Sequence, residues 1–542
     1  MPFRFSLLIT AIIGAYAALF FRLYSLQIQQ GSSYIKSVEA QAAGELAIAE
    51  RGSIYFTDKN GKALPVATTK DFPLVYGTPK SIEDPLETAH AVAAALDIDP
   101  EPLVSKLGKP GDNYELIERK VSGERAERVQ EAAIPGIYVK SVSERFYPFG
   151  ELAAHVLGFV APNNNEDLPA GRYGLEKFYN EELAGKPGGM NKGEVVLPIA
   201  GKDIHLTIDP NVQIEIEQIL DDLISKHQAV GGSIIIEDPA TGKILAMTSR
   251  PKFNPNDYQK AEIGDFLNPV TQQIYEPGSV FKVITMAAGI DAGKITPYTT
   301  FNDTGVLMVS GKKIQNWDLQ AHGLVTMTNI IEKSLNTGAA YAEKLTGHDN
   351  FRKYLNAFGF SDKTNLDLPG ELKGDLKRLA PGAPAIAYAT ASFGQGVAIT
   401  PIELVNAIAA IANGGMLMRP YVNAEMNSKS LRRVIKPETA QAVTQMMVSA
   451  VDKAEVAKID GYTFAGKTGT AQVPDFKHGG YSADVIHSYV GFGPTANPKF
   501  VILLKLDKPA GAPLAGQTVV PAFRDLAQFL VNYFNIPPDR IR

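Results

Sequence analysis

The hydrophobic pattern begins with an apolar run that predicts a membrane segment. Residues 5–21, FSLLITAIIGAYAALFF, carry no charge between Arg4 and Arg22. As a helix they span about 26 Å, against the roughly 30 Å hydrocarbon core of a bilayer, and the flanking arginines can snorkel to its surfaces. We therefore expect a cytoplasmic tail at residues 1–4 and a transmembrane anchor at residues 5–21. The alternative is a signal peptide cleaved after Ala15-Tyr16-Ala17, although the apolar run continues past that site.

After the anchor, short apolar strings alternate with Gly, Pro and charged clusters through residues 22–202. The best helical period lies in SIEDPLETAHAVAAALDI, residues 81–98. This mixture predicts a mixed α/β domain. Residues 184–203 are rich in Gly, Pro and Lys and lack a helical period, which predicts a linker or a pair of edge strands. We place the domain boundary between residues 202 and 203.

Residues 203–542 show the pattern of a second domain. LTIDPNVQIEIEQILDDLISKH predicts a short strand and an amphipathic helix, and two β-rich runs around residues 238–242 predict a hairpin. Near the end, SYVGFGP and KFVILLKLDKP predict two more strands, and FRDLAQFLVNYF predicts a closing helix. Helices and antiparallel strands at both ends of the segment predict an α+β fold in which the two ends meet in one sheet.

Composition narrows the chemistry of this 542-residue chain. Its formal net charge is -5, its pI is near 6.0, and it has no cysteine. The charge balance argues against a nucleic-acid partner. The absence of cysteine excludes disulfides, thiol catalysis and cysteine-ligated metal.

The pattern with most chemical content is Ser-x-x-Lys, which occurs four times, starting at Ser33, Ser249, Ser279 and Ser310. The tetrapeptide alone carries little information, because most such matches are N-cap serines with solvated lysines. Only Ser279 follows Pro-Gly and opens an apolar helix-forming run, EPGSVFKVITMAAGI. We therefore select Ser279 as the candidate nucleophile.

In a helix that begins at Ser279, Lys282 shares a face with the serine. Packing among Phe281, Val283 and Ile284 would desolvate its amine, lower its pKa and make it available as a base. The helix N-terminus would favour negative charge developing near the serine.

Two further motifs follow in order. Ser334-Leu335-Asn336 and Lys467-Thr468-Gly469-Thr470 each occur once after Ser279. Together with Ser-x-x-Lys they form the triple of penicillin-binding proteins and class A β-lactamases, although leucine replaces the aspartate of Ser-Asp-Asn. The last motif lies on a predicted strand, where Gly469 would let the backbone of a bound peptide approach closely.

Over nearly its whole length the chain resembles a class B penicillin-binding protein, a monofunctional peptidoglycan D,D-transpeptidase. Outside the triple, RGSIYFTDKNG, RFYPFG, AHVLGF and GRYGLEKFY resemble the family's pedestal motifs. In that family these motifs join the N-terminal module to the catalytic domain, so Arg51, Arg145 and Glu176 are left out of the catalytic set. The first motif departs from the family by two inserted residues and by Lys59 in place of arginine. SFGQGVAITPIELVNAIAAIANGG is more similar to the septal, FtsI-type branch than to the elongation branch.

The resemblance implies a pedestal at residues 22–202, a transpeptidase domain with the penicillin-binding, β-lactamase-like fold at residues 203–542, and an extracytoplasmic site on the inner (cytoplasmic) membrane. It implies acyl transfer from stem peptides, inhibition by β-lactams, and partnership with a glycosyltransferase of the SEDS family and other division proteins. No metal or organic cofactor is implied. The implied catalytic residues are Ser279, Lys282, Ser334, Asn336 and Lys467, the substrate-binding residues are Asn336, Lys467, Thr468, Gly469 and Thr470, and the oxyanion donors are the N–H groups of Ser279 and Thr470.

Other functions share the triple. A β-lactam sensor or division scaffold without catalysis would keep the fold, but the triple is intact and only one membrane segment is predicted. A β-lactamase or carboxypeptidase would hydrolyse the acyl-enzyme, but those enzymes lack the pedestal motifs. Hydrolysis in class A β-lactamases uses a glutamate. Glu371 lies in the corresponding stretch, in LPGELKGD, which predicts a solvated turn.

Overall fold

The computed structural model describes residues 49–162, 169–191, 194–475 and 477–540, together with Tyr16, Phe20 and Tyr24. Apart from Tyr16 and Phe20, the predicted anchor lies outside these residues, as does Ser33. Within the described part of the chain, no helix is long and apolar enough to cross a membrane. The chain forms two compact units, Met1–Gly52 with Glu181–Asp203, and Ser53–Asn180 with Ile204–Arg542.

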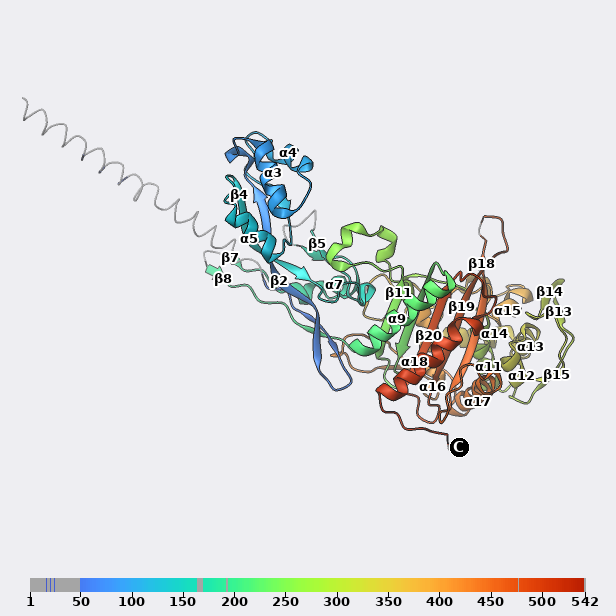
Figure 1. The fold of residues 1–542 in the computed structure, drawn as a ribbon. Coiled ribbons are helices and arrows are strands. Elements are labelled where there is room, and N and C mark those ends of the chain that lie inside the picture. Colours follow the sequence, from blue (N-terminus) through green and yellow to red (C-terminus); the bar gives the residue numbers. More distant parts are fainter. Residues whose placement is uncertain are drawn as a thin grey trace, which may run out of the picture. The chain divides into compact units, whose positions relative to one another are not determined.

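The second unit is built around a five-stranded antiparallel sheet in the order β11-β10-β20-β19-β18. Two amphipathic helices cover one face of this sheet (Figure 1). Ile234 and Ile236 of β10, Leu504 of β20 and Phe523 of α18 are buried in the core between these layers. The predicted hairpin, the two late strands and the closing helix are confirmed. The elements are β10 (Gly231–Glu237), β11 (Ile244–Arg250), β18 (Ala465–Pro474), β19 (Tyr481–Gly493), β20 (Phe500–Asp507), α9 (Pro210–His227) and α18 (Val519–Tyr533).

Helix α9 starts where the sequence predicts. Asp209 accepts hydrogen bonds from the N–H groups of Asn211 and Val212, and Pro210 occupies the first turn, where no N–H is needed. The amphipathic pattern then buries Val212, Ile216 and Leu220 against the sheet. A strong cap and a matched apolar stripe explain why this helix could be predicted.

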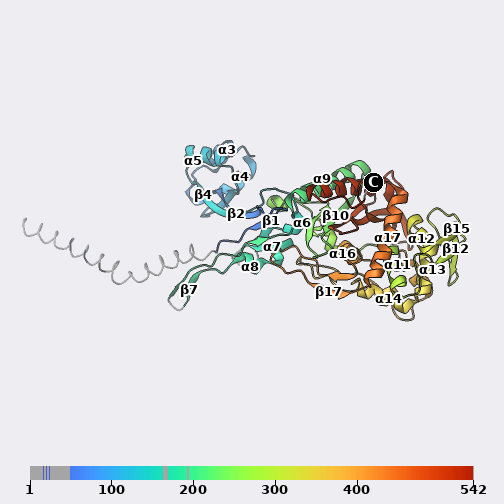
Figure 2. The same cartoon turned by 90° about the horizontal axis from the view of Figure 1, so that it is seen from below.

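The other face of the sheet is covered by apolar helices, among which α16 (Pro401–Ala412) is buried along nearly its whole length (Figure 2). Thr400 and Glu403 form a capping box at its start. The remaining helices of this part are α10 (Pro269–Gln272), α11 (Lys282–Asp291), α12 (Met327–Lys333), α13 (Asn336–Thr346), α14 (His348–Ala357), α15 (Ala385–Ala391) and α17 (Pro437–Ala454). Short two-stranded sheets join β12 (Thr300–Asp303) to β15 (Gly323–Thr326), β13 (Val306–Val309) to β14 (Lys312–Gln315), and β16 (Met416–Met418) to β17 (Ser430–Arg433).

The N-terminal part of the same unit has its own sheet, in which β4 and β3 pair with β2, and β2 and β9 pair with β1. Three helices bury Val75, Val92, Leu103 and Val129 in a separate core. The predicted helix in residues 81–98 is confirmed as α3. The elements are β1 (Ile54–Thr57), β2 (Ala63–Gly77), β3 (Glu115–Glu118), β4 (Ile137–Phe146), β9 (Ile204–His205), α3 (Pro85–Leu96), α4 (Glu101–Leu107), α5 (Gly123–Glu131), α6 (Ala154–Leu157) and α7 (Gly174–Phe178).

Two of the pedestal motifs meet inside this part of the chain. Arg145 Nε lies 2.6 Å from Glu176 Oε1, and both side chains are buried. Tyr147 donates its hydroxyl to the same carboxylate oxygen at 3.3 Å. Removing one partner of a buried ion pair leaves the other charge without compensation, so these motif residues are expected to stabilise the fold.

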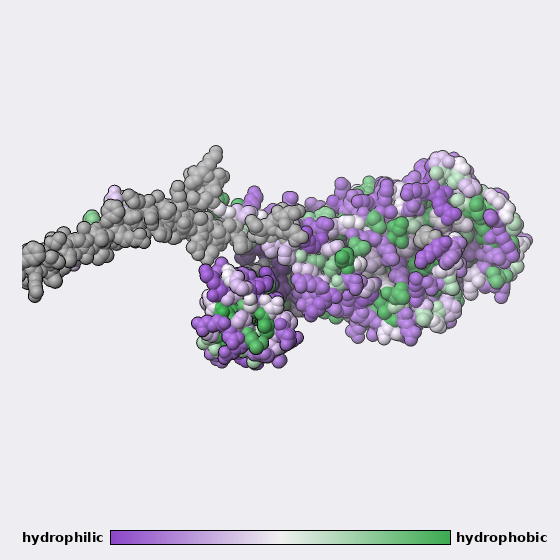
Figure 3. Space-filling model, turned by 90° about the horizontal axis from the view of Figure 1, so that it is seen from above, coloured by the Kyte–Doolittle hydropathy of each residue, from purple (hydrophilic) through white to green (hydrophobic). Residues whose placement is uncertain are grey.

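For residues 184–203 the sequence predicts either a linker or a pair of edge strands. In the first compact unit, β7 (Gly189–Asn191) and β8 (Glu194–Val196) pair antiparallel in a two-stranded sheet of their own, so the segment contains a strand pair. The domain bounds 22–202 and 203–542 remain a prediction. On the face seen in Figure 3, hydrophobic residues of the larger unit are scattered in small groups among polar ones.

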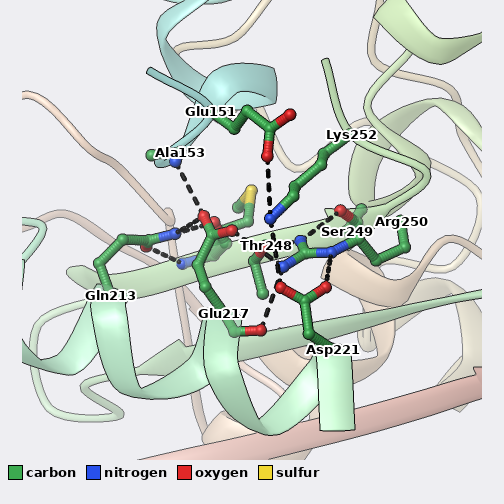
Figure 4. A network of polar contacts seen from close by, with 10 residues as sticks. Glu151, Ala153, Gln213, Glu217, Asp221, Thr248, Ser249, Arg250 and Lys252 are labelled. Atoms are coloured by element: carbon green, nitrogen blue, oxygen red, sulfur yellow. Dashed lines mark hydrogen bonds and ion pairs between the residues drawn. The ribbon is translucent and has the colours of Figure 1, made fainter. Parts of the chain in front are cut away.

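A polar network, which we call the Arg250 cluster, joins α9, β11 and the segment before α6 (Figure 4). The Arg250 guanidinium lies 2.5 Å from Asp221 and 3.1 Å from Glu217. Lys252 Nζ bridges Glu151 at 3.1 Å and Asp221 at 3.2 Å. Glu217 also accepts the N–H of Ala153 at 2.8 Å. Arg250 and Glu217 are buried, and the cluster holds an acid beside every cation.

Candidate active site

The nucleophile candidate lies at the start of a helix, as predicted. Gly278–Phe281 form a 3-10 turn that continues into α11 at Lys282. Gly278 has φ +60°, where an L side chain would be strained, and an added Cβ would lie 2.9 Å from the Ala471 side chain. Ser279 is half-buried, so the residue keeps part of its surface exposed to solvent.

Lys282 is fully buried one turn beyond Ser279. Its Nζ lies 2.9 Å from Ser279 Oγ, 3.1 Å from Ser334 Oγ and 2.6 Å from the Ser334 carbonyl oxygen. Burial, together with the nearby cation of Lys467, holds the pKa of Lys282 well below its usual range. A neutral amine within hydrogen-bond distance of a serine hydroxyl can accept its proton.

Ser334 connects the first and third motifs. Its Oγ lies 3.0 Å from Lys467 Nζ. Ser334 ends α12 in the left-handed region, with φ 58°. This conformation is costly for a non-glycine residue and is typical of positions that a site holds in place.

Lys467 is buried on β18, and burial lowers its pKa to about 7. Its Nζ also lies 3.0 Å from the Thr468 carbonyl oxygen. The two lysines and two serines thus form a chain of polar contacts in which both amines are desolvated. We call Ser279, Lys282, Ser334 and Lys467 the Ser279 cluster.

Strand β18 lies directly against the turn that carries Ser279. A Cβ added to Gly469 would lie 3.0 Å from the Pro277 carbonyl oxygen and 2.4 Å from Ser488 Oγ. Gly469 is therefore required by packing inside the protein. This is a different reason from the predicted approach of a substrate backbone to the glycine.

The remaining predicted residues lie around the same cluster. Asn336 begins α13 and donates its side-chain N–H to the Gln315 carbonyl oxygen at 2.9 Å. Thr468 Oγ1 lies 3.3 Å from Lys467 Nζ. Thr470 Oγ1 accepts the N–H of Ala515 at 3.3 Å. All three motifs are thus near one another, contributed by the 3-10 turn that leads into α11, the α12–α13 junction and β18.

Glu276 was not singled out from the sequence, although it lies three residues before Ser279. It accepts hydrogen bonds from the Gly396 N–H at 2.9 Å and from the Tyr481 hydroxyl at 2.9 Å. Burial raises the pKa of this carboxyl. Glu276 therefore ties the segment before the nucleophile to β19 and to the loop at Gly396. Its only sign in the sequence is its place in the EPGS string.

The expectation of a solvated turn at Glu371 is wrong. Glu371 is buried and accepts hydrogen bonds from the Thr364 N–H at 2.7 Å, the Thr364 hydroxyl at 2.5 Å and the Asn365 N–H at 3.0 Å. The two Thr364 donors are buried, so they need this carboxylate as their acceptor. A carboxylate occupied in this way is not placed to activate water.

Among the described residues, no group of three or more His, Asp or Glu side chains is arranged to hold a metal ion. The chemistry available from the Ser279 cluster is that of an activated serine: attack on a carbonyl carbon, an acyl-enzyme, and proton transfer through amines and hydroxyls.

Two family models match the chain. Residues 232–528 match the penicillin binding protein transpeptidase domain, and residues 47–196 match the penicillin-binding protein dimerisation domain.

Curated relatives cover most of the chain. Stage V sporulation protein D of Bacillus subtilis is 34% identical over 87% of this chain and 76% of its own length. Peptidoglycan D,D-transpeptidase FtsI of Escherichia coli is 27% identical over 100% of this chain and 93% of its own length. Peptidoglycan D,D-transpeptidase MrdA of Salmonella typhimurium is 28% identical over 96% of this chain and 94% of its own length.

Among solved structures, penicillin binding protein 2X of Streptococcus thermophilus superposes with a TM-score of 0.72 at 22% identity, covering 91% of this chain and 81% of that one. At this identity the match concerns the fold alone.

Proposed function

Because the chain belongs to the class B penicillin-binding proteins and is a serine-type peptidoglycan D,D-transpeptidase, we propose that it cross-links stem peptides through an acyl-enzyme on Ser279. One observation carries the assignment to this serine. The buried Lys282 amine lies 2.9 Å from Ser279 Oγ and has no carboxylate among its hydrogen-bond partners in the described chain.

The first step is acylation. Lys282 takes the proton of Ser279 as the hydroxyl attacks the penultimate D-Ala carbonyl, and the N–H groups of Ser279 and Thr470 stabilise the oxyanion. Ser334 relays a proton toward the departing D-Ala nitrogen. Asn336 binds the donor's amide, and Lys467, Thr468 and Thr470 bind the terminal carboxylate. Gly469 leaves room for the strand beside them.

The second step transfers the acyl group to an amine of a neighbouring stem. That amine attacks the ester carbonyl, its proton returns through the amines and hydroxyls of the site, and Ser279 leaves as a hydroxyl. β-Lactams enter the first step as mimics of the donor.

We further propose a septal role on the inner membrane, with residues 5–21 as anchor, an extracytoplasmic catalytic domain and a SEDS-family glycosyltransferase as partner. The similarity of the segment around Gln395 to the septal branch supports this role. The relatives include both FtsI and MrdA, so depletion in the host is the deciding measurement. Filaments that elongate without dividing are expected, and rounded cells would assign the elongation branch instead.

The test of the nucleophile is labelling with fluorescent penicillin. Ser279→Ala should abolish covalent labelling, whereas Ser33→Ala, Ser249→Ala and Ser310→Ala should keep it. Intact-mass spectrometry of the labelled protein should show an adduct that persists for many minutes after free drug is removed. Labelling that survives Ser279→Ala refutes the assignment, and rapid release of penicilloic acid would identify a hydrolase.

A further inference from the structure

The nucleophile turn and β18 meet through glycines, which offer no side chains to interlock. A Cβ added to Gly278 would lie 2.9 Å from the Ala471 side chain, and one added to Gly469 would lie 3.0 Å from the Pro277 carbonyl oxygen. In the described part of the chain, no hydrogen bond joins residues 277–281 to β18. Close packing of this kind resists compression, whereas a directional hydrogen bond is needed to resist sliding.

The backbone around Glu276, just before this turn, is fixed by a neighbouring loop. Tyr275 and Ile399 exchange both backbone hydrogen bonds, each at 2.9 Å. The Gly278 N–H donates to the Gly394 carbonyl oxygen at 3.1 Å. The Glu276 side chain therefore starts from a backbone that is bonded one residue before it and two residues after it.

From this fixed backbone the Glu276 side chain reaches two other segments, and we call its two contacts the Glu276 bridge. Oε1 accepts the N–H of Gly396 at 2.9 Å, and Oε2 accepts the hydroxyl of Tyr481 at 2.9 Å. Tyr481 is the first residue of β19 and pairs with Pro474, the last residue of β18. The bridge thus attaches the segment before the nucleophile to the far end of the strand that carries the third motif.

The near end of the third motif has its own attachment, because Lys467 Nζ contacts Ser334 Oγ at 3.0 Å. A single point of attachment lets a strand pivot, whereas two points fix its position. Acylation depends on that position, since one proposed oxyanion donor is the N–H of Ser279 on the turn and the other is the N–H of Thr470 on β18. A displacement of about 1 Å between such groups costs about a hundredfold in rate.

We propose that Glu276 is a positioning residue for acylation, whose two hydrogen bonds hold the nucleophile turn in a fixed position relative to β18. The proposal rests on the proposed role of Ser279 as nucleophile. In the described structure neither carboxylate oxygen of Glu276 is bonded to Ser279 or Lys282, so Glu276 acts through the segments that it joins. What the side chain supplies is its length and the two polar atoms at its end.

Two substitutions separate length from charge. Glu276→Gln keeps the length, and its amide can accept the Gly396 N–H through oxygen and donate to the Tyr481 hydroxyl oxygen through nitrogen. Glu276→Asp keeps the charge but is one methylene shorter, so it loses the reach to both partners at once. Glu276→Ala removes both bonds. Acylation should stay within about threefold of the unchanged rate for Glu276→Gln and should slow about tenfold to a hundredfold for the other two.

The measurement is the rate of covalent labelling by excess fluorescent penicillin, on the full-length chain in detergent, with the final labelled fraction recorded separately. Loss of folding lowers the labelled fraction, whereas a misplaced turn lowers the rate constant of the protein that still labels. Tyr481→Phe removes one of the two bonds and should slow labelling about threefold to tenfold. Combined with Glu276→Ala it should slow labelling no further, because the shared bond is already lost. The matched control Tyr298→Phe, at a tyrosine that is 83% exposed, should not change the rate.

Peptide mapping of the label on the unchanged protein reports on Ser279 itself, and a label on another residue would refute the proposed function whatever the variants do. With the label on Ser279, three results would overturn the role of Glu276. One is a Glu276→Ala rate within about twofold of the unchanged rate. Another is fast labelling of Glu276→Asp with slow labelling of Glu276→Gln, which would assign the effect to charge. The third is full additivity of Tyr481→Phe and Glu276→Ala.

Discussion

Two Ser-x-x-Lys tetrapeptides fold in this chain into clusters of opposite character. In the Ser279 cluster, the helix places Ser279 and Lys282 on one face, and the lysine amine is buried among hydroxyls and carbonyls. Beside the Arg250 cluster, Ser249 lies on β11, one residue before the strand ends, and its Oγ lies 2.9 Å from Ser233 Oγ. Lys252 forms ion pairs with Glu151 and Asp221. The same Ser-x-x-Lys motif therefore provides a desolvated base at Lys282 and an ion-paired lysine near the surface at Lys252.

The difference lies in the neighbouring charges. Carboxylates lie beside both Arg250 and Lys252, and the Arg250 guanidinium holds the pKa of Asp221 below its usual range. In the Ser279 cluster, burial lowers the pKa of both Lys282 and Lys467. The nearby Lys467 amine lowers the pKa of Lys282 further. A buried cation without an acid destabilises the fold but supplies a base at neutral pH.

The largest effect is expected from Lys282→Arg. A guanidinium keeps the charge but cannot accept the serine proton, so acylation by penicillin should slow about a hundredfold to ten-thousandfold. Stopped-flow acylation kinetics measure the rate. Lys252→Arg, at the matching position of the other tetrapeptide, is the control and should acylate within about twofold of the unchanged protein. A Lys282→Arg rate within about tenfold would refute the role of base.

Arg250→Met should be destabilising, because it leaves the buried Glu217 carboxylate without its cation. The expected loss in the free energy of unfolding is about 3–5 kcal/mol. Chemical denaturation followed by fluorescence or circular dichroism measures it. An unchanged midpoint would mean that the acids of the Arg250 cluster are neutral or hydrated instead of paired.

Lys467→Met should change the free energy of unfolding in the opposite direction to Arg250→Met. Acylation is lost, yet the free energy of unfolding rises by about 1–4 kcal/mol near pH 7. In the unfolded chain Lys467 binds its proton up to about pH 10.4, whereas burial lowers its folded pKa to about 7. Between these values the unfolded state binds more protons, so the stability of the unchanged protein rises with pH.

The stability gap between the Lys467→Met variant and the unchanged protein should therefore shrink between pH 7 and pH 9, by up to about 1.4 kcal/mol per pH unit. Denaturation of both proteins at the two pH values cancels effects common to the whole chain. A gap that stays constant would show that burial does not lower the pKa of Lys467 in the folded protein.

The smallest effect is expected from Glu151→Gln. This carboxylate is 48% exposed, and within the described part of the chain its one ion pair is with Lys252, which keeps Asp221 as a partner. Exposed ion pairs contribute about 0–1 kcal/mol, so the unfolding midpoint should barely move. A loss as large as that of Arg250→Met would mean that the segment before α6 is held mainly by this pair.

The strands, helices and motifs of the larger unit could be predicted because local signals agree there. Asp209 and Pro210 start α9, alternation marks the sheet strands, and Pro-Gly before Ser279 marks its turn. Interactions between distant segments could not be predicted: Gly469 meets Pro277, and Tyr481 meets Glu276, only after the chain has folded. The prediction for Glu371 was wrong for the same reason. The composition of the segment around it is typical of a solvated turn, whereas its hydrogen bonds to Thr364 and Asn365 form only in the folded chain.

Gly278 of the nucleophile turn packs closely against β18, and Gly469 of β18 packs closely against that turn. This packing has a consequence for drug resistance. Any side chain at either glycine would push β18 and the nucleophile turn apart, which would impair natural substrate and antibiotic together. Selection for lower β-lactam affinity is therefore expected to yield few tolerated substitutions at these two glycines. Tolerated changes are expected at the exposed margins of the cleft, where a bulky drug and a slender peptide make different contacts.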